Sequence, residues 1–160
     1  MLRKLYRRHF ADERRERLFL ASVSFLLTFA AVRGITYLIR AGQGPFQNVV
    51  AGTLHIHHLV WGILLLLAVG YVWLLEVGVS SGWVAGVTAL AFGVGAALTL
   101  DEFALWLNLQ DVYWQRQGRV SIDAVLIFAG LLSVGVWGWP FFGALARVIG
   151  HKAMSGGAYE

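Results

Sequence analysis

The chain has 160 residues, of which 58% are hydrophobic and only 14% are charged, and its formal net charge is +4. This composition excludes a separate soluble domain and is typical of an integral membrane protein. Cysteine is absent, which excludes disulfides, thiolate metal sites, iron–sulfur clusters and thiol catalysis. Seven of the thirteen Lys and Arg residues lie in the first seventeen positions, so the charge indicates membrane orientation and argues against a nucleic-acid partner.

Residues 1–17 form a basic segment with one apolar stripe at helical spacing. The stripe consists of Leu2, Leu5, Tyr6, His9 and Phe10. Arginines around such a stripe are typical of an amphipathic helix that lies on an anionic membrane leaflet. A partner-binding or disordered segment is the alternative.

Four apolar segments follow, each about as long as a helix that crosses a bilayer. They cover residues 18–39, 56–75, 82–107 and 124–149. Their length and their lack of alternation exclude strands, and Pro140 is expected to kink the last helix. We therefore predict an all-α fold, a four-helix transmembrane bundle over residues 18–150, with a cytoplasmic tail at residues 151–160.

Basic residues near both ends of the chain predict that both termini are cytoplasmic, with the bundle in a bacterial inner membrane. This orientation places many ionisable residues at the outer end of the bundle. They are His55, His57, His58, Asp101, Glu102, Asp111, Asp123, Arg33 and Arg40. Ionisable groups near hydrocarbon are costly unless they are paired, hydrated or metal-bound, so this cluster is the candidate site.

The third span has one face of small residues at helical spacing, which suits close helix contact. This face consists of Gly82, Gly86, Ala89, Gly93 and Ala97. Asp101 extends the face and is expected to point into the bundle. Glu102 lies about a hundred degrees round the helix, above Gly95 and Thr99.

The second span carries the histidines at its start. His58 lies above Gly62 on one face, and His55 lies one turn further out on that face. His57 is expected to point elsewhere, toward the side that bears Trp61. Two imidazoles one turn apart, facing carboxylates of the adjacent helix, are an arrangement that binds metals in helical bundles.

The preferred metal ligands are His55, His58, Asp101 and Glu102, with His57 and Asp111 in reserve. These nitrogen and oxygen donors suit Zn, Fe, Mn or Cu without choosing among them. A bound metal would activate a water molecule, and Glu102 is the candidate catalytic residue, as general base. The alternatives are a structural cluster, in which Arg33 or Arg40 neutralises a carboxylate, and a proton or cation pathway.

Arg33 lies near the outer end of the first span, where it can pair with a carboxylate or bind a lipid phosphate. It is the candidate substrate-binding residue. In the segment of residues 108–122, Tyr113 and Trp114 suit the headgroup belt of a membrane. Ser121 is expected to cap the last helix, with Asp123 in the first turn.

Three stretches resemble a group of small bacterial integral membrane proteins with the same four-span plan: HIHHLVWGILLLL, LTLDEFALWLNLQDVYW and GRVSIDAV. The resemblance runs from Leu54 to Leu126 and implies a common fold, but it adds no catalytic residue. Histidines and acids at one membrane face are also similar to those of the ceramidase-like membrane hydrolases. Those proteins have more spans and an HxxxH element, and this chain has neither.

The predicted function combines a His/carboxylate site near the outer face with a divalent metal and a lipid-like substrate. One alternative is a non-catalytic accessory or assembly subunit that docks membrane protein partners or further copies of itself through its small-residue faces. Another is a proton or cation pathway. The inner halves of the spans lack the further polar residues that such a pathway requires.

Overall fold

The computed structural model describes residues 6, 10–45, 47, 50–51, 54–75, 82–110 and 112–137. The predicted kink at Pro140, the tail at residues 151–160, the reserve ligand Asp111 and residues 1–5 and 7–9 of the basic segment lie outside this description. Side chains at residues 50–51, 54–55 and 134 lie outside it as well, and these include the predicted ligand His55.

Four long helices make up most of the described chain: α2 (Glu13–Arg40), α3 (His58–Leu75), α4 (Gly82–Asp101) and α6 (Arg119–Trp137). All four are long and apolar enough to cross a membrane, α6 together with the 3-10 turn η1 (Arg116–Gly118) that precedes it. The shorter elements are α5 (Phe103–Asn108) and an antiparallel pair of two-residue strands, β1 (Val50–Ala51) and β2 (Leu54–His55). Apart from this small ladder, the predicted helical fold with four helices of membrane-spanning length is confirmed.

The first helix begins before the predicted start of its span at residue 18. Asp12 caps it, because the Asp12 side chain accepts a hydrogen bond of 3.0 Å from the Arg14 N–H. Glu13 and Glu16 follow in the first turn, where negative charge is favoured by the helix dipole. The last residues of the basic segment therefore belong to the first long helix.

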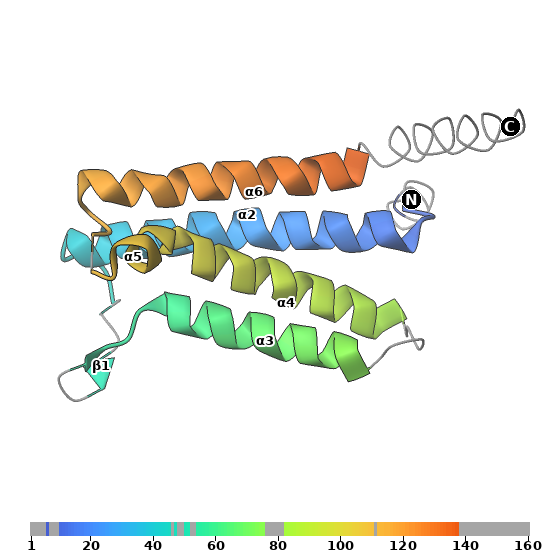
Figure 1. Cartoon of the computed structure of the whole chain (residues 1–160), viewed down its shortest axis with the longest axis horizontal. Coiled ribbons are helices and arrows are strands. Elements are labelled where there is room, and N and C mark those ends of the chain that lie inside the picture. The colour runs from blue at the N-terminus through green and yellow to red at the C-terminus, as the bar shows by residue number, and fades with distance from the viewer. Residues whose placement is uncertain are drawn as a thin grey trace, which may run out of the picture.

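The long helices lie side by side, and α4 packs against both α2 and α3 (Figure 1). The helix α6 packs mainly on α2 and also contacts α4. At one end of the bundle, α2 and α4 end and α3 begins (Figure 1). We call this the polar end, since the ionisable residues described below lie there.

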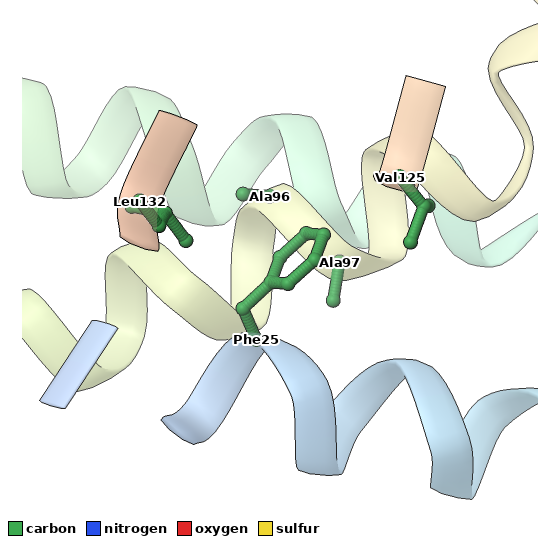
Figure 2. Packing of buried hydrophobic residues seen from close by; sticks show 5 residues of the cluster. All are labelled: Phe25, Ala96, Ala97, Val125 and Leu132. Carbon is green, nitrogen blue, oxygen red and sulfur yellow. The ribbon is translucent and has the colours of Figure 1, made fainter. Parts of the chain in front are cut away.

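The apolar core lies where three helices meet. It is formed by Phe25 of α2, Ala96 and Ala97 of α4, and Val125 and Leu132 of α6 (Figure 2). Only one of these five side chains is aromatic, and the two alanines allow α4 to approach the ring of Phe25 closely (Figure 2). The core therefore fixes α4 between its neighbours and sets the direction of its carboxy-terminal end.

Glycines set the separation of the helices on both sides of α4. A Cβ atom on Gly93 would overlap the α2 backbone at Ala21, and a Cβ on Gly62 of α3 would come within 2.8 Å of the Gly95 carbonyl oxygen of α4. Ala89, Gly93, Ala97 and Asp101 are buried, so the predicted small-residue face is confirmed over this part. Gly82, at the start of that face, is exposed.

We expect Gly62→Ala to destabilise the bundle by about 1–3 kcal/mol, because the added methyl group must push α3 away from α4. The matched control is Gly70→Ala on the same helix, where a Cβ would meet nothing within 4 Å. That control should be neutral or stabilising by up to about 1 kcal/mol, since alanine favours helix over glycine. Equilibrium unfolding in mixed micelles measures both, and an equal effect of the two changes would contradict the close α3–α4 contact.

Candidate functional site

A network of ionisable side chains joins three helices and one loop at the polar end. Arg33 comes from α2, His57 and His58 from the start of α3, and Asp101 and Glu102 from the end of α4. The sequence places these residues far apart, up to 69 positions between the arginine and Glu102. Packing of α2 and α3 on α4 brings them together.

Asp101 is the centre of the network and is 0% exposed. Its Oδ1 atom accepts a hydrogen bond from the Arg33 Nε–H, and Arg33 is itself largely buried. Its Oδ2 atom accepts from the Tyr113 hydroxyl at 2.8 Å and lies 3.0 Å from the His58 Nε2 atom. Both oxygens of this carboxylate are therefore occupied by protein groups, as a buried charge requires.

Glu102 is 4% exposed and binds the start of α3. Its Oε2 atom accepts a hydrogen bond of 2.9 Å from the Leu59 backbone N–H, and its Oε1 atom lies 2.8 Å from the His57 Nδ1 atom. The first N–H groups of a helix lack partners within the helix and carry partial positive charge. Glu102 thus acts as a capping group for α3, supplied by a different helix.

The two neighbouring carboxylates reach opposite sides because α4 lies between α2 and α3. Asp101 ends α4, and Glu102 interrupts the helix before α5 begins at Phe103. Asp101 pairs with Arg33 of α2, while Glu102 accepts the Leu59 N–H of α3. His58 links the two, with its Nε2 atom near Asp101 and its Nδ1 atom 3.5 Å from the Glu102 Oε2 atom.

The loop between α5 and η1 completes the network through Tyr113. The chain turns at Leu109, which ends α5 with a positive φ of 50°, and then places the Tyr113 ring 4.6 Å from the Arg33 guanidinium. Burial raises the pKa of the Tyr113 hydroxyl well above its ordinary value, and the charge of Asp101 raises it further. Our sequence analysis assigned Tyr113 to the headgroup belt and missed this role.

The raised pKa of Tyr113 predicts a specific loss of stability at high pH. The folded state keeps the phenolic proton at a pH where the unfolded chain releases it, so this contribution is complete below about pH 10 and declines above it. Tyr113→Phe should therefore flatten the decline in unfolding free energy above about pH 10. Unfolding curves at increasing pH measure this, with the exposed Tyr71→Phe as control; equal declines in both variants would contradict it.

Ser121 has a different role from the one predicted. The helix α6 begins at Arg119, so Ser121 lies inside its first turn and not at the cap. Its Oγ atom accepts a hydrogen bond of 2.9 Å from the Ala104 N–H at the start of α5, and both residues are buried. Asp123, which was expected in the first turn of this helix, is exposed. Ser121 thus joins α6 to α5 beside the carboxylates.

The structure does not support the predicted metal site. Among the described residues, no group of three or more His, Asp or Glu side chains is arranged to hold a metal ion. The four carboxylate oxygens of Asp101 and Glu102 instead face Arg33, Tyr113, histidine or backbone donors. The ligand role of His55 stays a prediction, because its side chain lies outside the description.

Two further assignments change with the geometry. Arg33, the predicted substrate-binding residue, is paired with Asp101, which matches the structural alternative in which this arginine neutralises a carboxylate. His57 was expected to point away from the acids, yet it pairs with Glu102. It precedes the first helical residue of α3, so the helical rotation used to orient it does not apply.

A cavity of about 550 Å³ lies beside the network, between α2, the start of α3 and the loop that carries Tyr113. The helix α2 lines it with Val32, Ile35 and Ile39, which we call the apolar wall, and with the polar residues Thr36 and Arg40. We call His57, His58 and Glu102 the polar wall, and Gln47, Ile56 and the aromatic residues Trp61, Tyr113 and Trp114 complete the lining. The cavity is within the size range of small-molecule sites, about 300–1,000 Å³.

Fold and site together define a helical protein with four helices long and apolar enough to cross a membrane and a buried ion-pair network beside a cavity of mixed polarity. Comparison with protein-family models, with curated proteins and with solved structures finds no match to the chain.

Proposed function

We propose that this chain is a protein of the bacterial inner membrane that binds a lipid-like, amphipathic molecule in the cavity at its polar end. The cavity faces the periplasm in this proposal, because the excess of Lys and Arg near both termini favours a cytoplasmic location for the opposite end. The observation that carries the proposal is that the cavity lining combines apolar side chains of α2 with polar side chains of the network.

The apolar wall suits a hydrocarbon chain. Val32, Ile35 and Ile39 recur at intervals of three and four residues, so they form one stripe along α2. A hydrocarbon chain of the ligand that lies against this stripe removes apolar surface from water or replaces a membrane lipid there. The stripe ends at Arg40, where the helix reaches the polar end. A bound molecule that follows it would therefore carry its polar group at that end.

The polar wall is held rigidly by the network. Glu102 is fixed by the Leu59 N–H and by His57, and Asp101 behind it is fixed by Arg33 and Tyr113. Groups whose positions are set by such partners need little rearrangement when a ligand binds, which favours affinity. The buried network therefore supports binding through preorganisation, and it needs no metal ion for this role.

One contact supports a second candidate function, acid–base catalysis on the bound molecule. The His57 Nδ1 atom lies 2.8 Å from the Glu102 Oε1 atom, and both residues line the cavity. An imidazole oriented by a carboxylate is the arrangement of a general base. If this function holds, wild-type protein converts its bound lipid into a product of different mass and His57→Gln does not.

The binding proposal is tested by filling the cavity. Val32→Trp should reduce retained lipid about tenfold after detergent washing, because the indole occupies the apolar wall. Leu38→Trp adds the same side chain to the same helix at an exposed position that does not line the cavity. Native mass spectrometry of both variants counts the bound lipid. Equal retention in Val32→Trp and the wild type would overturn the proposal.

A further inference from the structure

We infer that the headgroup of the bound molecule is zwitterionic, with an anionic phosphate toward Arg40 and a cationic nitrogen toward Glu102. This inference rests on the proposed binding of an amphipathic molecule and specifies its chemistry. It is carried by the charges at the two sides of the cavity and by the aromatic rings between them.

The positive side of the cavity is Arg40, the last residue of α2. Its guanidinium carbon lies 4.2 Å from the centre of the Trp114 ring, which is in turn 5.2 Å from the Tyr37 ring. Across the described part of the chain, no carboxylate lies within ion-pair distance of Arg40. A guanidinium that lies over an indole ring can still use its N–H groups for bidentate binding of a phosphate.

The negative side of the cavity follows from the charges in the network. Asp101 and Glu102 face a single guanidinium, that of Arg33, so the carboxylates of the network outnumber its guanidinium by one. Glu102 lines the cavity directly, and Asp101 lies behind it. A cationic group in the cavity compensates this charge in surroundings where an unpaired charge is costly.

Aromatic rings favour the same placement of a cation. Trp61, Tyr113 and Trp114 line the cavity together with Glu102, and since Tyr113 and Trp114 already face Arg33 and Arg40, Trp61 is the ring proposed for the ligand cation. Ring faces attract ammonium and quaternary ammonium groups, most strongly where water is excluded. A headgroup with a phosphate and an amine therefore matches both sides of the cavity, whereas a purely anionic headgroup leaves the charge near Glu102 without compensation.

The inference is tested on the wild-type protein with lipids that share the same acyl chains. Phosphatidylethanolamine and phosphatidylcholine should bind about tenfold more tightly than N-acylated phosphatidylethanolamine, which keeps the phosphate but has no cationic nitrogen. Phosphatidylglycerol should bind as weakly as the N-acylated lipid. Soluble glycerophosphoethanolamine, which has the headgroup but no acyl chains, tests whether the chains are needed for binding. If it displaces phosphatidylethanolamine at a similar concentration, the role of the apolar wall is contradicted.

Two variants test which residue binds the phosphate and which binds the cationic nitrogen. Arg40→Gln should weaken the binding of all of these phospholipids by a similar factor, because each one carries a phosphate. Glu102→Gln should bring the ratio between phosphatidylethanolamine and its N-acylated form close to one. Arg40 is exposed, so its variant should fold, and the wild-type ratio remains decisive if the Glu102 variant does not fold.

The outcomes separate the two proposals. If no phospholipid binds in the cavity, the proposed function is wrong. If lipids bind but phosphatidylglycerol equals or exceeds phosphatidylethanolamine, only the zwitterionic headgroup is wrong.

Discussion

Asp101→Ala is expected to lower the free energy of unfolding by about 3–5 kcal/mol, which is the cost of removing one partner from a buried ion pair. The change leaves the Arg33 guanidinium, whose side chain is only 15% exposed, without its carboxylate. It also removes the acceptor of the Tyr113 hydroxyl and the partner of the His58 Nε2 atom. Equilibrium unfolding in mixed micelles, followed by helical circular dichroism, measures the loss.

Two controls separate this ion pair from a general effect of charge. Glu13→Ala removes an exposed carboxylate whose distance to the Arg17 Nη1 atom is 4.0 Å, and it should cost at most about 1 kcal/mol. The double variant Arg33→Met with Asp101→Leu removes both charges and should recover much of the loss. The account of the network fails if Asp101→Ala and Glu13→Ala cost the same.

Glu102→Ala is the second change with a large expected effect, about 2–3 kcal/mol, because hydrogen bonds to a charged group are stronger than neutral ones. It leaves the buried Leu59 N–H without an acceptor and removes the partner of His57. Negative charge is also lost at the start of α3, where the helix dipole favours it. Glu102→Gln keeps an acceptor oxygen and should cost about half as much.

The effect of Glu102→Ala should be localised. Amide hydrogen exchange should accelerate at Leu59 and over the first turn of α3, while the distant core around Phe25 keeps its protection. A uniform acceleration across all four helices would show that Glu102 stabilises the bundle in some other way than by capping α3.

The sequence predicted the inward direction of Asp101 because α4 is a continuous helix from Gly82 to that residue. Residues at steps of three and four stay on one face only while the helix is unbroken. The face with Ala89, Gly93 and Ala97 therefore pointed reliably to a buried carboxylate. Glu102 was placed above Gly95 and Thr99 without a choice between an inward direction and a neighbouring groove, and the structure shows that it bonds the start of α3.

Helical periodicity failed where the backbone is not helical. His57 precedes α3, and Tyr113 lies in a loop whose direction depends on the turn at Leu109. Neither position carries a pattern from which its partner could be deduced. Ser121 was misassigned because the η1 turn starts the last helix earlier than its apolar pattern indicates.

The metal site was predicted from the side chains that could supply ligand atoms. The sequence does not show which of these atoms are already bound by other protein groups. A histidine and a carboxylate at helical spacing look alike in a metal site and in an ion-pair network. Two contacts distinguish an ion-pair network from a metal site here. The Arg33 side chain of α2 binds Asp101, and the Leu59 N–H of α3 binds Glu102. Both contacts are tertiary, so a single sequence does not determine them.

The central claim is that an amphipathic molecule occupies the cavity, and lipid cross-linking tests it most directly. Protein in nanodiscs is irradiated with a phospholipid that carries a diazirine on an acyl chain, and the modified residues are identified by mass spectrometry. We expect modification at Val32, Ile35 or Ile39 that excess unlabelled lipid suppresses, because a site is saturable. Modification confined to exposed positions such as Leu27 and Leu131, without competition, would contradict the account.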